Sequence, residues 1–213
     1  MPTVFPLEII YLADPMCSWC YGFSPEITQL KNDYAEKAKF TLIMGGLRAG
    51  GGDAWDEQMK NFLKDHWKHV HEESGQEFGY ELFEKEHFDY DTEPACRAVR
   101  VVREMSPKQE FDFFKAIQKG FYLENKDPKS VDFYKPICEK LNIPFIVFRS
   151  KFLSPKYKEL LQMDFDVCKN WGIRGFPTVV LGIDGGYKIV VNGYTKYENL
   201  KSKIEYLIAA VRN

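Results

Sequence analysis

The stretch D-P-M-C-S-W-C-Y-G-F (residues 14–23) places two cysteines two residues apart, directly after an apolar run. That run, L-E-I-I-Y-L (residues 7–12), predicts a short buried strand. The S-P pair at residues 24–25 is typical of a helix start, although the helix can also begin at the cysteines. The sequence therefore predicts a strand, a turn and a helix, with Cys17 and Cys20 at the turn.

Two cysteines at this spacing have three interpretations: a redox dithiol, half of a metal site, or two buried packing residues. The turn favours the dithiol, because unpaired N–H groups and the positive dipole at a helix N-terminus favour a thiolate at Cys17. Cys20 follows about one turn later, within reach of a disulfide. Such a pair can attack a substrate disulfide and then resolve the mixed disulfide.

The metal interpretation has less support, because a closed zinc site needs four ligands and no second C-x-x-C follows. The run H-W-K-H-V-H (residues 66–71) could bind metal, but such a run is more often a solvated helix face. We therefore predict no metal site. Cys138 and Cys168 stand alone on apolar helix faces, where we expect them to be core residues.

Composition restricts the classes of protein that are possible. The chain has 213 residues, 45% of them hydrophobic, which suits one large domain or a small domain with an insertion. A formal net charge of −2 argues against a nucleic-acid partner, and no run reaches the roughly 18 apolar residues of a membrane span. The N-terminus lacks the pattern of a secretory signal, and five cysteines with one close pair suit redox chemistry in the cytoplasm.

The remainder of the chain predicts a helical region between two halves of a sheet. F-T-L-I-M (residues 40–44) predicts a second strand, and the glycine-rich residues 45–53 lack a phosphate-binding motif, so we expect a flexible connection. Residues 55–153 have helical spacing of aromatic and charged side chains, with a capping box at residues 106–109. A further helix should begin at residues 154–155.

The C-terminal part predicts a hairpin and a last helix. T-V-V-L (residues 178–181) is a strand pattern, D-G-G (residues 184–186) is a turn signal, and residues 187–191 form the partner strand. A second capping box at residues 195–198 then begins a helix.

The segment G-F-P-T (residues 175–178) lies directly before the first strand of this hairpin. A proline belongs at the start or edge of a strand, and X–Pro bonds are the usual place for a cis peptide. The residues alone favour a trans bond at Pro177. A cis bond would leave the backbone of Phe176 free to pair with an extended substrate.

These elements in this order resemble the DsbA family of thioredoxin-fold proteins. The sequence is most similar to the cytoplasmic branch described as FrnE-like or as predicted protein-disulfide isomerases. The resemblance covers essentially the whole chain and includes T-E-P-A-C-R-A (residues 92–98). It implies an α/β thioredoxin fold with a large all-helical insertion. The implied domains are a thioredoxin-like domain of residues 1–46 and 154–213, and an insertion domain of residues 47–153 that caps the active site.

The resemblance also implies roles for site residues. Cys17 becomes the exposed nucleophile and Cys20 the buried resolving thiol. Pro177 becomes a cis proline that packs against the disulfide, and the backbone of Phe176 becomes a substrate contact. Trp19 is either a lid over the sulfur or a contact for apolar substrates.

Several positions differ from the family pattern or have two interpretations. Ser18 and Trp19 replace the Pro-His pair of the periplasmic oxidase, so strong oxidant character is not expected. Asp14 is either a turn residue or a charge that tunes Cys17. Cys96 is either a packing residue or a third thiol near the dithiol.

The leading hypothesis is a cytoplasmic protein-disulfide oxidoreductase or isomerase that acts on protein or small disulfides. It needs no cofactor besides its own Cys17–Cys20 disulfide, and glutathione or a thioredoxin-type reductant is the expected partner. The alternatives are a glutathione-dependent transferase or isomerase of a small molecule, and a non-catalytic peptide- or metal-binding module. Retention of both cysteines counts against the transferase.

Overall fold

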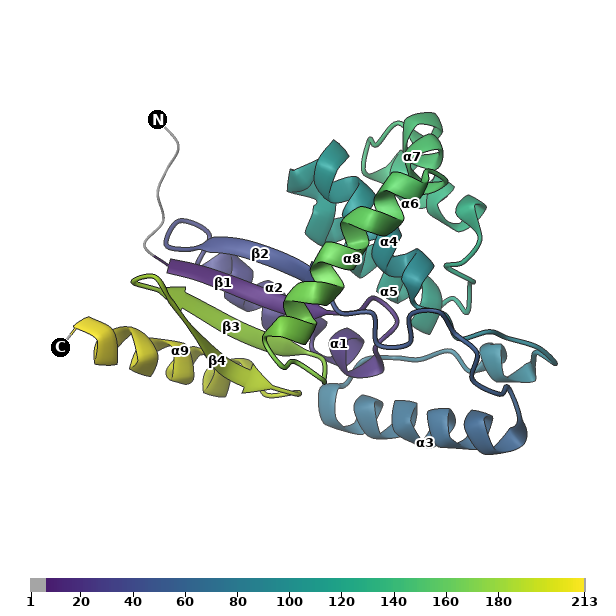
Figure 1. The fold of residues 1–213 in the computed structure, drawn as a ribbon. Coiled ribbons are helices and arrows are strands. Elements are labelled where there is room, and N and C mark those ends of the chain that lie inside the picture. The colour runs from purple at the N-terminus through teal and green to yellow at the C-terminus, as the bar shows by residue number, and fades with distance from the viewer. Residues whose placement is uncertain (1–6, 213) are drawn as a thin grey trace.

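The computed structural model describes residues 7–212, which form a four-stranded sheet with helices on both faces and a helical region at one end (Figure 1). The strand order is β2-β1-β3-β4, with β1 parallel to β2 and antiparallel to β3. The strands are β1 (Leu7–Ala13), β2 (Lys39–Met44), β3 (Thr178–Ile183) and β4 (Gly186–Asn192). These four strands lie where the sequence predicts them.

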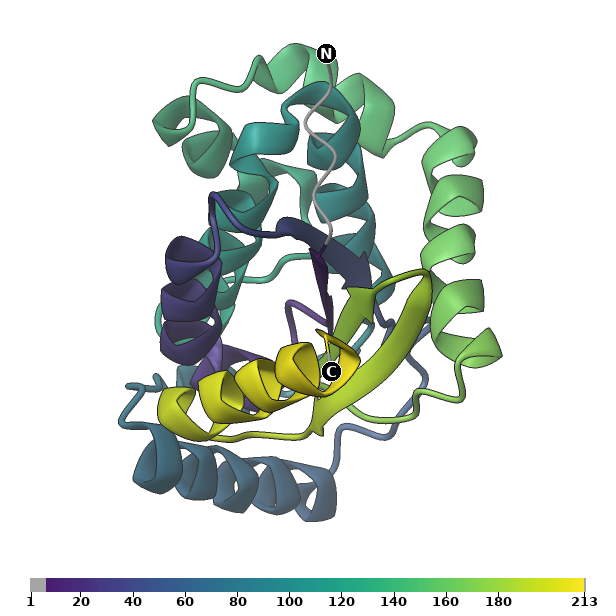
Figure 2. The same ribbon diagram turned by 90° about the vertical axis from the view of Figure 1, so that its left-hand side faces the viewer.

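Strand β1 is central and is buried on both faces, which is why its sequence is apolar rather than alternating. Ile9 and Tyr11 belong to the main core cluster, whereas Ile10 and Leu12 pack with Cys168 in a second cluster on the other face. Figure 2 shows α2 and α9 on one side of the sheet and α8 on the other. These helices are α2 (Ser24–Asp33), α8 (Pro155–Asn170) and α9 (Tyr197–Arg212).

The region between β2 and α8 is helical, as expected. Its α-helices are α3 (Glu57–Ser74), α4 (Glu93–Met105), α5 (Glu110–Tyr122), α6 (Lys135–Lys140) and α7 (Phe145–Phe152). Short 3₁₀ turns are η1 (Glu81–Glu84), η2 (Pro107–Gln109) and η3 (Val131–Tyr134). The division into two domains at residues 46/47 and 153/154 stays a prediction, and residues 1–6 and 213 lie outside the described residues.

The predicted capping box at residues 106–109 is wrong. Ser106 makes no capping hydrogen bond with its side chain, and residues 107–109 form η2 before α5 begins at Glu110. The chain turns between α4 and α5 here. Ser106 is both the C-cap residue of α4 and the N-cap residue of η2. Its backbone N–H bonds back to Val102, so it ends α4 more than it starts α5.

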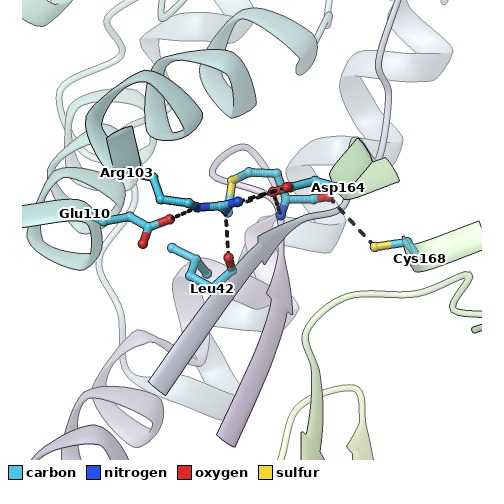
Figure 3. Close-up of polar contacts among 6 residues, drawn as sticks. Leu42, Arg103, Glu110, Asp164 and Cys168 are labelled. Carbon is cyan, nitrogen blue, oxygen red and sulfur yellow. Dashed lines mark hydrogen bonds and ion pairs between the residues drawn. The ribbon is translucent and has the colours of Figure 1, made fainter. Parts of the chain in front are cut away.

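A buried ionic group joins the helical region to the sheet (Figure 3). The guanidinium of Arg103 on α4 donates to both carboxylate oxygens of Asp164 on α8, at 2.8 Å each. It also donates to Glu110 at 2.6 Å and to the carbonyl of Leu42 on β2 at 2.7 Å. Asp164 in turn accepts from the backbone N–H of Met44 at 2.9 Å. One arginine therefore connects two helices of the region with the edge strand of the sheet.

The glycine-rich loop after β2 makes hydrogen bonds to residues 89 and 91, and its flexibility stays a prediction. The backbone N–H groups of Gly50 and Gly52 donate to the carboxylates of Asp91 and Asp89, at 2.8 and 3.0 Å. Positive φ angles at four of its glycines let the chain make these turns without steric strain. The acceptors come from a distant segment of sequence, so the glycine pattern alone gave no sign of them.

Candidate active site

The two close cysteines lie at the carboxyl end of β1, where the chain turns into a helix (Figure 1). Cys17 is the N-cap residue of α1 (Ser18–Gly22), and its carbonyl accepts the N–H of Tyr21 at 3.0 Å. Helix α1 continues through Phe23 into α2 with a small break. Cys20 sits within α1, and both thiols are free. The strand, turn and helix predicted around the dithiol are confirmed.

Both sulfur-bearing residues are buried, which corrects the implied exposure of Cys17. Cys17 keeps 4% of its surface exposed and Cys20 keeps none. The chain before β3 explains this, because the thiol of Cys17 donates to the carbonyl of Phe176 at 3.5 Å. A side chain expected at the surface is therefore covered by a segment 159 residues away.

The segment that covers Cys17 has a distinct backbone. The peptide bond between Phe176 and Pro177 is cis, and the carbonyl of Pro177 accepts the N–H of Gly193 at 2.7 Å. The hydroxyl of Thr178 donates to the carbonyl of Gly175 at 2.8 Å. These bonds fix the backbone of the segment whose Phe176 carbonyl contacts the Cys17 thiol.

Trp19 projects from α1 into a group of aromatic rings. It meets His66 and His69 of α3 edge-on, with ring centroids 5.9 and 5.4 Å away, and Tyr194 at 5.7 Å. A hollow of about 330 Å³ opens at this point. Its lining residues are Trp19, His69, Glu73, Phe176, Gly193 and Tyr194. One member of the histidine run, His69, therefore lines the hollow, while His66 contacts Trp19 beside it.

These histidines do not complete a metal site. Within residues 7–212, no three histidine, cysteine or acidic side chains come together in a group that could hold a metal ion. Burial lowers the pKa of His66, and the charges of His69 and Arg48 lower it further. His66 therefore tends to stay neutral beside Trp19.

Asp14 is fully buried at the centre of a hydrogen-bond group. Its carboxylate accepts the N–H groups of Met16 and Leu47, at 2.7 Å each, and the thiol of Cys96 at 3.5 Å. The hydroxyl of Thr92 is a further donor. Asp14 thereby ties the active-site turn to the glycine-rich loop and to α4.

The charge of Asp14 acts on Cys20. Burial raises the pKa of the Asp14 carboxyl, while its four hydrogen bonds oppose the rise. Burial also raises the pKa of Cys20 well above the ordinary value, and the neighbouring sulfur of Cys17 and the carboxylate of Asp14 add to this. Burial likewise raises the pKa of Cys96, which therefore stays a protonated donor to Asp14. Cys20 therefore holds its proton strongly.

Two residues near the site carry no signal in the sequence. The hydroxyl of Tyr90 donates to the carbonyl of Met16 at 2.9 Å, next to Cys17. The guanidinium of Arg48 lies 5.6 Å from the centre of the Tyr90 ring and pairs with Asp53. A hollow of about 350 Å³, lined by the glycine-rich loop, opens beside this arginine. Neither residue belongs to a motif, so only the fold brings them here.

The contact between Gly45 and Phe176 yields a testable prediction. A Cβ atom at residue 45 would lie 2.1 Å from Cζ of the Phe176 ring, so the Gly45→Ala variant must displace that ring. We expect kcat/KM for disulfide exchange to fall about tenfold, because the displaced ring would also shift the Phe176 carbonyl that contacts the Cys17 thiol. The free energy of unfolding should change by only about 1 kcal/mol, since a half-buried ring can move aside. Steady-state kinetics measure the change of kcat/KM, and urea unfolding measures the change of stability.

Gly186→Ala is the matched control, because a Cβ there meets only the carbonyl oxygen of Ile183 at 3.6 Å. An unchanged kcat/KM in Gly45→Ala would show that the position of the Phe176 ring does not matter for turnover.

A free dithiol after the first strand, with one thiol bonded to the carbonyl that precedes a cis proline, defines a thiol–disulfide oxidoreductase of the DsbA type. The chain belongs to the thioredoxin family, because the model of that family, described as thioredoxin, matches residues 11–202.

Solved structures of similar proteins have the same fold. A protein from Nitrosomonas europaea, named as a candidate protein disulfide isomerase, is 32% identical with a TM-score of 0.89, covering 96% of this chain and 98% of its own. The cytosolic disulfide reductase DsbM from Pseudomonas aeruginosa is 20% identical with a TM-score of 0.74, covering 95% and 99%. The predicted fold class, an α/β thioredoxin fold with a helical insertion, is confirmed.

Curated relatives are more distant. The protein named ClpXP adapter protein SpxH is 20% identical in Shouchella clausii, over 84% of this chain and 59% of that relative. The one from Bacillus subtilis is 21% identical, over 82% of this chain and 58% of its own length. The chain therefore spans less than two thirds of the length of these relatives. Among the helices of residues 7–212, none has the length and apolar character to cross a membrane.

Proposed function

We propose that the protein reduces or isomerises disulfides of proteins or small molecules in the cytoplasm, with Cys17 as nucleophile and Cys20 as resolving thiol. The observation that carries the proposal is the contact of the Cys17 thiol with the carbonyl of Phe176, one turn from a second, fully buried thiol. The dithiol is itself the redox group, so exchange needs no further cofactor. The reducing cytosol suits this direction, and the neighbour DsbM is named a cytosolic reductase.

The reaction balances as two exchange steps. The Cys17 thiolate attacks a substrate disulfide R–S–S–R′, forms the Cys17–S–S–R bond and releases R′S⁻. Cys20 then loses its proton, which the released R′S⁻ takes up, and attacks the Cys17 sulfur. RS⁻ leaves and takes a proton from solvent. The substrate gains two electrons, and the protein holds a Cys17–Cys20 disulfide that a thiol reductant must reduce.

Access to Cys17 requires movement of its cover. Phe176 and Trp19 are both half-buried side chains that border the aromatic hollow, so they can shift without unfolding the core. The substrate then pairs with the backbone of Phe176 beside Pro177. Trp19 serves as both lid and wall in this arrangement.

The remaining site residues support the dithiol. Asp14 fixes the turn before Cys17, and its charge raises the pKa of Cys20. Cys96 donates to Asp14, which favours a positioning role over that of a third reactive thiol. Ser18 is buried as the first residue of α1, directly after Cys17.

Insulin reduction with glutathione or a thioredoxin-type dithiol as electron donor tests this proposal. DsbM has been solved with glutathione, which makes that thiol the first donor to try. The reduction potential of the dithiol, measured in a glutathione buffer, then separates reductase from isomerase function. Two sulfurs at the site favour disulfide exchange over a transferase, which needs only one activating group. Absence of insulin reduction with every donor would reject the proposal.

Arg48 gives the site a charge preference that can be measured. Its partner Asp53 is 43% exposed and therefore exchangeable, so a substrate carboxylate can take its place on the guanidinium. We expect Arg48→Ala to raise KM for glutathione disulfide about fivefold and leave KM for neutral hydroxyethyl disulfide unchanged. Asp53→Asn should lower KM for glutathione disulfide, because it removes the competing carboxylate.

Arg149→Ala, an exposed arginine on α7, controls for loss of one positive charge. Equal changes of KM for both disulfides in Arg48→Ala would argue for a general disturbance of the loop instead of charge recognition.

A further inference from the structure

Tyr90 reaches from the helical region to the turn that carries the dithiol. Its side chain is buried, and its hydroxyl donates to the carbonyl of Met16 at 2.9 Å. Met16 is buried as well and directly precedes Cys17, so this carbonyl belongs to the peptide unit that joins the two residues. A hydrogen bond from a distant segment therefore acts on the backbone of the proposed nucleophile.

The peptide unit between Met16 and Cys17 is also held at its other end. The N–H of Cys17 donates to the carbonyl of Asp14 at 3.1 Å, and the N–H of Met16 donates to the Asp14 carboxylate at 2.7 Å. The thiol of Cys17 donates to the carbonyl of Phe176 at 3.5 Å. Of these partners, only Tyr90 comes from the helical region, and it alone donates to the carbonyl.

The ring of Tyr90 is itself fixed. The rings of Phe88 and Phe121 meet it edge-on, with centroids 5.8 and 5.5 Å away, and the guanidinium of Arg48 lies 5.6 Å from its centre. The residues on either side of it, 89 and 91, accept hydrogen bonds from the glycine-rich loop. The hydroxyl is therefore a preorganised donor that needs no rearrangement when charge develops near it.

A second tyrosine extends the hydrogen bond into a chain. The hydroxyls of Tyr90 and Tyr122 lie 3.3 Å apart. Because Tyr90 uses its single proton on the carbonyl of Met16, Tyr122 is the donor in this contact. Burial raises the pKa of both tyrosines, so both keep their protons at neutral pH. Hydrogen bonds in such a chain polarise one another, which strengthens the last bond, to the carbonyl of Met16.

We propose that Tyr90 is a positioning residue for Cys17, because it holds the peptide unit before Cys17 and takes up part of the negative charge on its carbonyl oxygen, so that a thiolate forms more readily on the adjacent side chain. The role rests on the proposed function, since that thiolate performs the first exchange step. Tyr90 keeps its own proton, and the step balances as written above. A carbonyl oxygen without a donor would oppose a negative sulfur beside it.

Tyr90→Phe tests this role in the Cys20→Ser background, which leaves Cys17 alone in the C-x-x-C. The measurement is the rate of Cys17 alkylation by neutral iodoacetamide across a range of pH, with the modified residue located by mass spectrometry. We expect alkylation to slow about fivefold at neutral pH. At alkaline pH the two rates should converge, because the thiol is then ionised in both proteins. A merely structural role would slow the reaction equally at every pH.

Other titratable groups near Cys17 and Tyr90 come from several elements. They are Tyr11 of β1, Asp14 of the turn, Cys20 of α1, Arg48 of the glycine-rich loop and Tyr122 of α5. Cys20 is replaced in both proteins that are compared, and the other groups are present in both. A difference between the two pH profiles therefore reports the Tyr90 hydroxyl.

Tyr122→Phe is a second variant that removes only the outer bond of the chain. The carbonyl of Met16 keeps its donor, so we expect alkylation of Cys17 at neutral pH to slow by about twofold, in the same direction. This variant also tests the proposal if Tyr90→Phe does not fold.

Tyr134→Phe is the matched control. Tyr134 is equally buried, but its hydroxyl donates to the carbonyl of Pro128 within the helical region. This variant should lose stability and keep the parent pH profile.

The proposal is overturned if Tyr90→Phe and Tyr122→Phe leave the profile unchanged, if they slow alkylation equally at every pH, or if Tyr134→Phe shifts the profile as much. Insulin reduction, measured with Cys20 present, tests the proposed function separately. A shifted profile in a protein that reduces no insulin would reject the proposed function and retain the role of Tyr90. An unshifted profile in an active enzyme would do the opposite.

Discussion

Cys17→Ser should slow the rate of insulin reduction by about a thousandfold or more, because a serine hydroxyl neither ionises near neutral pH nor forms a disulfide. Cys20→Ser should behave differently. It keeps the nucleophile but lacks the resolving thiol, so a mixed disulfide with substrate should accumulate on Cys17. Turnover assays measure the first effect, and mass spectrometry of the intact protein under non-reducing conditions measures the second.

The buried location of Cys17 makes this contrast informative. Only 4% of Cys17 is exposed, so its cover must move before a substrate reaches the sulfur, and an adduct trapped in Cys20→Ser would demonstrate that movement. Cys138→Ala is the control, since Cys138 is buried in α6 away from the dithiol and should leave turnover intact. Full activity of Cys17→Ser, or the absence of an adduct on Cys17 in Cys20→Ser, would remove the assigned roles.

Arg103→Met should lower the free energy of unfolding by about 3 kcal/mol, because it leaves partly buried carboxylates of Asp164 and Glu110 without their counter-charge. Burial already raises the pKa of Glu110, and the arginine beside it opposes the rise. The two carboxylates also raise the pKa of Arg103, against the effect of its burial. Urea unfolding followed by circular dichroism gives the change.

A double-mutant cycle separates the ion pair from simple loss of packing. Asp164→Asn alone should also be destabilising, and the double variant should lose less than the sum of the two, since the pair contributes to both single changes. Arg149→Met, which removes an exposed arginine on α7, should change stability by no more than about 0.5 kcal/mol. Strict additivity of Arg103→Met and Asp164→Asn would mean that the contact in Figure 3 contributes nothing to stability.

Local signals in the sequence were reliable where one short segment fixes its own structure. The apolar run of residues 7–12 and the turn D-G-G gave the right strand and hairpin, because buried strands and tight turns depend on nearest neighbours. The same dependence on neighbouring residues explains the wrong prediction at residues 106–109. These residues match a capping box, but the backbone N–H of Ser106 bonds to Val102 and ends α4.

The candidate site also combines residues that local motifs identify with residues that only the fold brings together. The C-x-x-C spacing and the G-F-P-T segment identify the dithiol and the chain that covers it, and the resemblance they support gives the fold. The contacts of Trp19 with α3 and of Arg48 with Tyr90 join segments with no shared motif. No periodicity records which distant residue faces which, so these partners came only from the folded chain.

By itself the sequence determined the order of strands and helices and the position of Cys17 and Cys20 at a strand-to-helix turn, because backbone geometry and apolar spacing act over a few residues. Only the tertiary structure decided that Cys17 is covered by Phe176 and that Asp14 is bonded to the glycine-rich loop. Those features depend on packing between segments far apart in the chain, where burial removes water and sets both hydrogen bonding and ionisation.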